Sequence, residues 1–202
     1  MNPAASSGIR WVNVNRRGPI ETAKEHSLAD RARNGDLDAF EELMHARIDA
    51  IYRISFAIVG DEADARDSTQ ETFIAAWRRI RGLRDPDRFD AWLQRIAVNA
   101  ARMTLRSRSR RRVREIPSGD VASLAALSDG AKPDRSDADL IGAALARLPL
   151  DQRTIVVLHH LEGLDLAALS EILEIPIGTV KSRLHTARQG LQAALAAEAR
   201  RP

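Results

Sequence analysis

Apolar side chains recur at intervals of three and four residues along most of the chain, and no stretch alternates as a half-buried strand does. In the N-terminal half this pattern predicts three helices, over 28–34, 36–59 and 62–80. A fourth helix is expected after Asp85 and Pro86, a capping residue and the proline favoured in a first helical turn. Its apolar face is expected to run from Phe89 to Met103.

The C-terminal half resumes the helical pattern after an interruption. Between 107 and 137 the periodicity fails and Pro, Gly and Ser accumulate, which is typical of a linker. Beyond it the pattern predicts helices over 140–148, 151–162, 166–173 and 178–197. We therefore expect an all-α protein with two small helical domains joined by a flexible linker. Its parts are a disordered polar leader (1–27), a first domain (28–106), the linker (107–137) and a second domain (138–197).

The last two predicted helices form a candidate helix-turn-helix. Asp165 can cap the first of them, and a short turn over 174–177 leads into the second. One face of the second helix is apolar, and basic and hydroxyl groups lie elsewhere on it, as in a helix that enters the major groove: Lys181, Ser182, His185 and Arg188. An ordinary α-hairpin with a solvated face fits the periodicity equally well. Glu174 counts against the motif, because glycine adopts the left-handed turn conformation more easily.

Charge is distributed unevenly along the chain, although the formal net charge is only +3. Residues 28–77 hold 5 basic and 11 acidic side chains, whereas residues 78–114 hold 13 basic and 3 acidic ones. Helical spacing places one polar stripe opposite the apolar face of the fourth helix: Arg88, Arg95, Asn99, Arg102 and Arg106. Such a stripe can bind phosphates and stack on exposed bases, so a nucleic acid is favoured over a merely solvated face.

Several kinds of chemistry lack support in the sequence. The chain has no cysteine, which excludes disulfides, cysteine-ligated zinc, iron–sulfur clusters and thiol catalysis. Adjacent His159 and His160 point about 100° apart on a helix, which disfavours joint metal binding. No nucleophile–base pairing or phosphate-binding glycine loop is evident. With no membrane-spanning run or signal peptide either, we expect a cytoplasmic protein without membrane insertion, cofactor, metal or enzymatic activity.

Two segments resemble the bacterial extracytoplasmic-function (ECF) sigma factors of the sigma-70 family. Residues 178–185, Gly-Thr-Val-Lys-Ser-Arg-Leu-His, are similar to the promoter-reading helix of that family. Residues 70–73, Gln-Glu-Thr-Phe, and 92–99, Trp-Leu-Gln-Arg-Ile-Ala-Val-Asn, are similar to its first conserved domain. The two matches occur in the family's order and cover roughly residues 28–195.

The resemblance implies a factor that directs promoter-specific transcription initiation, with core RNA polymerase and promoter DNA as partners and an anti-sigma factor as a further one. The implied polymerase-docking residues are Asp67, Gln70 and Glu71. Those implied for recognising and melting the minus-10 element are Arg84, Arg88, Arg95, Asn99, Arg102 and Arg106, with the loop 81–87 capturing a flipped base. Those implied for reading the minus-35 element are Thr179, Lys181, Ser182, His185, Thr186 and Arg188.

The chain departs from the family pattern at a few of these positions. Arg66 and Ser68 stand where an acid and an aliphatic residue are common, and Thr186 stands where arginine is usual. The main alternative function is a stand-alone helix-turn-helix regulator that binds duplex DNA unaided. A helical nucleic-acid enzyme is a weaker alternative. A regulator of that kind has no need for an acidic docking helix joined to an arginine stripe, so the first domain favours the sigma factor.

Overall fold

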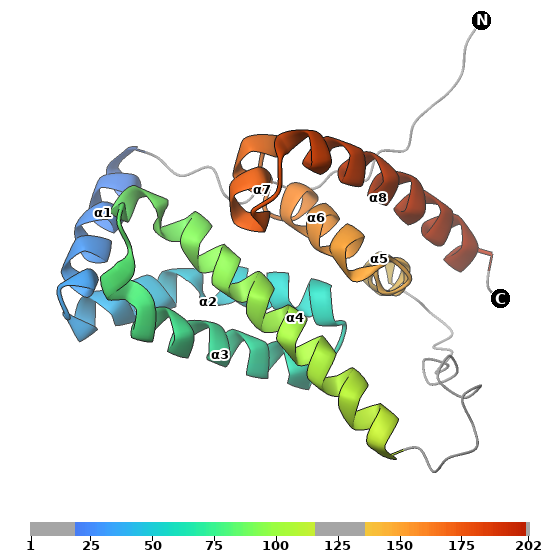
Figure 1. Cartoon of the computed structure of the whole chain (residues 1–202), viewed down its shortest axis with the longest axis horizontal. Helices are drawn as coiled ribbons and strands as arrows, with labels where there is room; N and C mark the ends of the chain where they lie inside the picture. The colour runs from blue at the N-terminus through green and yellow to red at the C-terminus, as the bar shows by residue number, and fades with distance from the viewer. Residues whose placement is uncertain (1–18, 116–135, 201–202) are drawn as a thin grey trace, which may run out of the picture.

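The computed structural model describes residues 19–115 and 136–200, and these residues are helical without any strand. The first domain holds α1 (Pro19–Arg33), α2 (Leu37–Val59), α3 (Glu62–Arg79) and α4 (Phe89–Glu115). Two short 3-10 helices, η1 (Ile80–Gly82) and η2 (Pro86–Arg88), lie between α3 and α4. The second domain holds α5 (Asp137–Ala146), α6 (Leu150–His160), α7 (Leu166–Leu173) and α8 (Ile177–Glu198). The all-α fold with two helical domains is confirmed (Figure 1).

Capping side chains fix the junction between α2 and α3. The Asp36 carboxylate accepts a hydrogen bond from the Ala39 backbone N–H at 3.0 Å, which begins α2 and lowers the pKa of Asp36. Gly60, at φ 73°, ends α2 in the left-handed conformation that suits glycine. Asp61 then caps α3 by accepting from the Asp64 N–H at 3.0 Å. These local signals explain why the predicted boundaries of both helices lie so close to the observed ones.

Two helix boundaries differ from their predictions within the described residues. Helix α1 begins at Pro19 rather than at 28, and α4 continues to Glu115 rather than ending at 106. The earlier start arises from tertiary contacts, because His26 bonds Asp87 in the distant loop before α4. Arginine favours helix, and Arg108 also pairs with Asp64 at 2.9 Å, so α4 runs on. The rest of the predicted leader and linker, 1–18 and 116–135, lies outside the described residues.

The fourth helix also differs in detail from its prediction. Asp85 caps η2, not α4, which begins at Phe89. Met103 is 65% exposed, although the pattern placed it on the apolar face. The buried face of α4 passes through Ala97 and Ala101, and Met103 follows two residues later on the other side of the helix.

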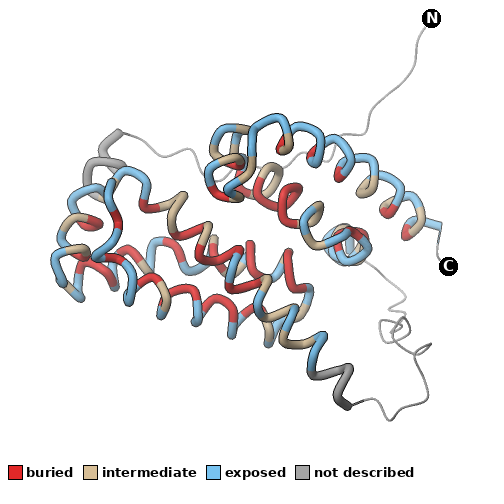
Figure 2. Tube along the Cα trace, viewed as in Figure 1, coloured by how far each residue is buried: buried red, intermediate tan, exposed pale blue. Residues whose placement is uncertain are grey.

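The two domains pack on each other and share one continuous apolar interior. Large fully buried side chains occur in both domains, including Leu43, Ile54 and Leu93 in the first and Ile155, Leu158 and Leu169 in the second. All of these belong to a single cluster. Figure 2 shows the buried positions along the faces that α2, α4, α6 and α8 turn toward one another. The face of α8 that carries the predicted DNA-reading residues remains exposed.

Arg47 is a buried charge that joins three helices. Its side chain in α2 is 5% exposed, and its Nε and Nη2 atoms donate to the Asp90 carboxylate of α4 at 2.6 and 3.2 Å. The Nη2 atom also lies 2.7 Å from a carboxylate oxygen of Glu25 in α1. Such a bidentate pair fixes geometry as well as charge. Arg47 therefore holds α1 and the start of α4 against α2.

We expect Arg47→Ala to lower the free energy of unfolding by about 3 kcal/mol, because it removes a buried side chain that packs between three helices and leaves two partly exposed carboxylates without their cation. Urea denaturation followed by circular dichroism measures this change. Arg53→Ala, at an exposed position of the same helix, is the matched control and should change stability by less than about 0.5 kcal/mol. Equal stability of the two variants would contradict the assignment.

A glycine brings α8 close to the junction of α5 and α6. A Cβ atom added to Gly190 would lie 2.9 Å from Leu148 Cδ2 and 3.3 Å from Gln152 Oε1. The first of these distances is shorter than van der Waals contact, so a larger residue would require a shift of the Leu148 side chain or of α8. The position of α8 on the domain therefore depends on this contact.

Candidate nucleic-acid interface

The predicted polar stripe of η2 and α4, called here the arginine stripe, comprises Arg88, Arg95, Asn99, Arg102 and Arg106. Arg88, Asn99 and Arg106 are exposed, whereas Arg95 and Arg102 are half-buried. The apolar side of α4 opposite them is buried against α2 and α3, and it includes Leu93, Ala97 and Ala101. Packing of α4 thus fixes the direction in which the stripe faces.

An acidic edge of the second domain, formed by Asp151, Glu171 and Glu174, lies against this stripe. The three ion pairs, measured from guanidinium nitrogen to carboxylate oxygen, are Arg88–Glu171 (2.9 Å), Arg95–Glu174 (2.8 Å) and Arg102–Asp151 (3.1 Å). Sequence reasoning missed these contacts, because the partners are far apart in the chain.

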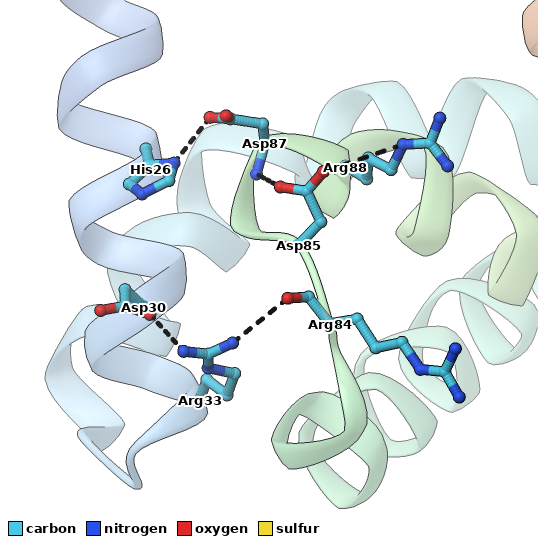
Figure 3. Close-up of polar contacts among 7 residues, drawn as sticks. All are labelled: His26, Asp30, Arg33, Arg84, Asp85, Asp87 and Arg88. Atoms are coloured by element: carbon cyan, nitrogen blue, oxygen red, sulfur yellow. Dashed lines mark hydrogen bonds and ion pairs between the residues drawn. The ribbon is translucent and has the colours of Figure 1, made fainter.

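The loop before α4 is held in place by α1 (Figure 3). Arg33 Nη1 donates to the backbone oxygens of Leu83 and Arg84 at 3.3 and 3.4 Å. At the other end of the loop, His26 Nδ1 lies 2.6 Å from an Asp87 carboxylate oxygen. The Arg84 side chain points away from α1. The loop is therefore anchored by its backbone while Arg84 stays available for a ligand.

A cavity of about 650 Å³ opens between this loop and α4. On the side of the first domain it is lined by Gly82, Arg84, Arg88, Trp92 and Arg95, and on the other side by Glu171 and Ile172. Guanidinium planes and an indole ring are the groups on which unpaired bases stack. The structure thus brings the predicted loop and part of the arginine stripe together around one hollow.

The helix-turn-helix has the geometry that the sequence predicts. Asp165 accepts from the Ala168 N–H at 2.8 Å and begins α7, and Ser170 Oγ donates to the Ile175 oxygen at 2.6 Å across the turn. Glu174 adopts φ 54°, so the residue that counted against the motif does occupy the left-handed position. Helix α8 begins at Ile177.

The exposed face of α8 carries most of the predicted minus-35 residues. Thr179 is half-buried, and the exposed ones are Lys181, Ser182, His185, Thr186 and Arg188. Two of the hydroxyls bond back to their own helix, Ser182 to the Thr179 oxygen and Thr186 to the Ser182 oxygen, each at 3.1 Å. Val180, Leu184 and Ala187 are buried on the opposite face and orient the helix.

Arg188 is bound by two histidines of α6. His159 Nδ1 lies 2.7 Å from the Leu164 carbonyl oxygen, which can only accept, so this nitrogen carries the proton. His159 Nε2 then accepts from Arg188 Nη2 at 2.8 Å, and His160 Nε2 accepts from Arg188 Nε at 3.4 Å. Burial lowers the pKa of His160 to about 4, and the Arg188 charge adds to the shift, as would a proton on the neighbouring His159 ring. The histidine pair therefore ties α8 to α6, a role that the sequence did not indicate.

We expect stability to fall as the pH drops from about 6.5 to about 4, because unfolded His160 takes up a proton that the folded side chain resists. His160→Gln should remove about 1 kcal/mol of this acid-dependent loss, a value reduced for the partial exposure of the group. Thermal melting at neutral and acidic pH measures the difference. His45→Gln, an exposed histidine of α2, is the control. Identical acid sensitivity of both variants would contradict the expectation.

A second hollow, called here the docking groove, lies between α2 and α3 and has a volume of about 1070 Å³. Its apolar lining comprises Phe40, Met44, Ile48, Tyr52, Phe73, Ile74 and Trp77, and Gln70 is at its side. Two of these residues are substantially exposed, Ile48 at 40% and Trp77 at 37%. Their helical spacing in the sequence is the same as that of buried core residues. Asp67 and Glu71 are both exposed on α3. Asp67 lies about one helical turn before Gln70, and Glu71 directly follows Gln70. A large exposed apolar patch of this kind marks a protein-binding site.

Two further properties concern only the part of the chain that the structure describes. No group of three or more histidine, aspartate or glutamate side chains is placed to hold a metal ion. No helix is long and apolar enough to cross a bilayer.

Comparison with known families identifies both domains. Residues 43–111 match the model of sigma-70 region 2, and residues 138–191 match that of sigma-70 region 4. These are the domains that carry, respectively, the arginine stripe with the docking groove and the helix-turn-helix. A match to both regions in this order also disfavours a stand-alone helix-turn-helix regulator.

Curated relatives extend over nearly the whole chain. The ECF RNA polymerase sigma factor SigE of Mycolicibacterium smegmatis is 34% identical over 189 residues, which are 92% of this chain and 71% of that protein. SigW of Bacillus subtilis, also an ECF RNA polymerase sigma factor, is 31% identical over 80% of this chain and 91% of its own length. The chain belongs to the ECF sigma factors of the sigma-70 family, the factors that direct RNA polymerase to promoters.

Solved structures agree with this assignment. CnrH in complex with the cytosolic domain of CnrY has a TM-score of 0.65 and 27% identity, covering 86% of this chain and 98% of that one. The sigma factor RpoE of Bartonella quintana, in complex with the anti-sigma factor NepR, has a TM-score of 0.64 and 25% identity, covering 79% and 98%.

If α8 reads the minus-35 element, Lys181→Ala is expected to weaken its binding by about 1–3 kcal/mol, because the ammonium exposed at the start of α8 is placed to contact a phosphate or a guanine. Substitutions of Ser182 and His185 should instead alter base preference. Binding of labelled minus-35 duplexes, at one fixed salt concentration, measures both effects. Wild-type promoter activity in all three variants would show that α8 does not read the duplex.

Proposed function

We propose that this sigma factor uses separate surfaces for docking, melting and duplex reading. Core polymerase binds the docking groove with Gln70 and the neighbouring acids of α3. The arginine stripe and the cavity beside it hold the unpaired minus-10 strand. The exposed face of α8 reads the minus-35 duplex. The observation that carries this assignment is the cavity bounded by the anchored loop and α4, because it joins stacking groups to phosphate-binding groups on one rigid helix.

The docking surface combines an apolar hollow with acidic side chains. Protein interfaces of this type have an apolar centre and a polar rim that selects the partner by charge. Trp77 and Ile74 supply exposed apolar area in the groove, whose charged lining is Asp49, Glu62, Arg66 and Arg78. Asp67 and Glu71 are exposed on α3 beside Gln70, outside the lining. A basic or amphipathic helical surface of the polymerase is the complementary partner.

The melting surface has the properties that an unpaired strand requires. Unpairing and unstacking a base costs a few kcal/mol, and a pocket that receives the base offsets part of that cost. Trp92 and Arg95 line the cavity and can stack on a base, and Asn99 lies farther along the exposed stripe with hydrogen-bonding groups for a base edge. Arg102 and Arg106 continue the stripe along the path of the sugar–phosphate backbone.

We also propose an anti-sigma factor as a partner and the cytoplasm as the place where the protein acts. CnrH and RpoE were solved with CnrY and the anti-sigma factor NepR, and we extend this to an anti-sigma partner for the present chain. The chain acts in the cytoplasm, where polymerase and promoter DNA are found. It has no catalytic activity of its own, since nucleotide transfer belongs to the polymerase.

Co-purification with core polymerase, followed by transcription from a promoter library, tests the proposal. We expect a stable complex with core polymerase and transcripts that start downstream of one shared pair of promoter elements. A chain that fails to join core polymerase and instead binds duplex DNA as a dimer would contradict the proposal and favour the helix-turn-helix regulator.

A further inference from the structure

The hydrogen-bond acceptors of Arg188 are imidazole nitrogens rather than carboxylates. Its Nη2 atom donates to His159 Nε2 at 2.8 Å, and its Nε atom donates to His160 Nε2 at 3.4 Å. Among the residues that the structure describes, no carboxylate forms an ion pair with Arg188. A neutral acceptor fixes the direction of a guanidinium without cancelling its charge. Arg188 is therefore oriented and still carries a full positive charge for a ligand.

The other lysine and arginine side chains of α8 are held differently. Arg183 Nη1 lies 3.7 Å from an Asp151 carboxylate oxygen, so this cation faces an acid. Lys181 is exposed at the start of the helix and contacts no described side chain through its ammonium. Of these three cations, Arg188 alone is both fixed in direction and free of an acidic partner within the described residues.

The histidines use one edge of the Arg188 guanidinium and leave the other accessible. A guanidinium has two forked pairs of N–H groups, and both histidine contacts lie on the pair formed by Nε and Nη2. The second pair, formed by Nη1 and the remaining N–H of Nη2, has no partner among the described residues. Arg188 is exposed. Because two parallel N–H groups match two oxygens of a phosphate, this second edge is suited to a phosphate group.

The two histidine rings are themselves fixed in place. His159 Nδ1 donates to the Leu164 oxygen at 2.7 Å, and the rings pack edge to face with their centroids 4.7 Å apart. Histidines in the last turn of a helix usually favour the protonated form, because the helix dipole attracts a cation there. Here burial, with the Arg188 charge adding to it, holds the pKa of His160 at about 4. Near neutral pH His160 is therefore an acceptor and not a competing cation.

The place of Arg188 along α8 indicates which part of a duplex it meets. Seven residues, or about two helical turns, separate it from Lys181, so both lie on similar sides of the helix. Arg188 is about 10 Å farther from the N-terminal end. The N-terminal residues of a recognition helix contact base edges, whereas cations beyond them meet the sugar–phosphate backbone.

We propose that His159 and His160 are positioning residues that hold Arg188 ready for a phosphate of the minus-35 duplex. This inference rests on the proposed reading role of α8. In the free chain the histidines fix one edge of the guanidinium, and the other edge binds phosphate oxygens when the helix enters the groove. A long side chain loses conformational freedom when it binds, and part of that loss has already occurred in the free protein, which strengthens binding.

Two substitutions of His159 separate this role from a structural one. Glutamine places an oxygen near the position of Nε2, so His159→Gln keeps an acceptor for Arg188 and loses the donor to Leu164. Asparagine places its amide near the position of Nδ1, so His159→Asn can still donate to Leu164 but offers Arg188 no acceptor. A purely structural histidine is better replaced by asparagine, whereas a positioning histidine is better replaced by glutamine.

Binding of the holoenzyme to a labelled duplex that carries the minus-35 element and ends before the minus-10 element measures the effect. The His159→Asn holoenzyme should bind about two- to tenfold more weakly than the wild type, as expected for the ordering of one long side chain. The His159→Gln holoenzyme should bind like the wild type. Neither change should alter base preference, since a phosphate contact carries no direct sequence information. His45→Asn, at an exposed position of α2, is the matched control and should bind normally.

Two variants of Arg188 complete the binding experiment. In an Arg188→Ala background the asparagine and glutamine variants of His159 should bind equally, because the residue through which His159 acts is gone. Arg188→Lys keeps the charge at an exposed position but loses the forked pair of N–H groups. It should bind about as weakly as His159→Asn.

An independent readout needs no DNA. Nitrogen-15 NMR of the full-length chain reports on the Nε–H group of Arg188, whose signal is assigned by its absence in Arg188→Ala. This signal should shift toward the range of solvated arginines in His159→Asn and stay in place in His159→Gln. Circular dichroism confirms that each variant is folded.

Equal binding by the asparagine and glutamine variants of His159 would overturn the inference, and so would weaker binding by the glutamine variant. Wild-type binding by Arg188→Lys would also overturn it, because charge alone would then suffice. Each of these results leaves the proposed function intact if Lys181→Ala weakens binding to the same duplex. Unchanged binding by the Lys181, Ser182 and His185 variants would instead contradict the proposed reading role of α8.

Discussion

The double variant Gln70→Ala, Glu71→Lys is expected to keep its helices and to lose its association with core RNA polymerase. Both side chains are exposed on α3, so their replacement leaves the interior of the first domain unchanged. The lysine reverses the charge next to the docking groove, and the alanine removes a polar group from its edge. Reversing a charge at a complementary interface slows association and leaves a partner charge unpaired, which together cost several kcal/mol.

Size-exclusion chromatography with core polymerase measures the loss, and circular dichroism reports whether the helices persist. The matched control, Gln192→Ala with Glu41→Lys, makes the same change of residue types and charge at exposed positions outside the groove lining. It should co-elute with core polymerase like the wild type. Normal co-elution of the Gln70 and Glu71 variant would remove the docking assignment.

Asn99→Ala and Arg102→Ala, made separately, are expected to abolish most of the open complex while sparing polymerase and minus-35 binding. A base-stacking or strand contact contributes about 1–3 kcal/mol, so each variant should form about 5- to 150-fold less open complex. Permanganate reactivity of unpaired thymines in the holoenzyme complex measures it. The holoenzyme is the suitable sample, because in the free chain Arg102 also contacts Asp151.

A promoter that is melted in advance provides the control for this experiment. It should restore part of the activity of both variants, since unpairing no longer has to be driven by the protein. Arg53→Ala, away from the stripe, should form open complex normally. Normal opening by the Asn99 and Arg102 variants would mean that the stripe binds phosphates only or is simply solvated.

Local signals in the sequence determine much of the fold. Asp36, Gly60, Asp61 and Asp165 act within a few residues of their own position, so helix ends near them could be predicted. The stripe on α4 also follows from spacing, because a helix places residues three and four apart on one side. The start of α1 and the end of α4 could not be found this way, since they depend on contacts between distant helices.

The same distinction separates the predicted and the missed parts of the candidate site. Residues of the stripe and of α8 are recognisable by type and spacing. Arg47, the histidine pair around Arg188 and the acidic edge are not recognisable in this way, because each works through partners more than 20 residues away in the chain. The docking groove was missed for another reason: Ile48 and Trp77 obey the helical period of a core but lie where no helix of the described chain covers them.

Gly190 lies in the second half of α8, where the helix packs closely against Leu148. The crowded contact with Leu148 lies nine residues after Lys181, about 13 Å along the helix axis. A methyl group at this point would have to be accommodated by a shift of the Leu148 side chain or of α8, and a shift of α8 would also move its N-terminal end, which we propose to enter the major groove. If α8 reads the minus-35 duplex as we propose, a change of promoter preference is expected to arise at Gly190 without alteration of any side chain on the reading face.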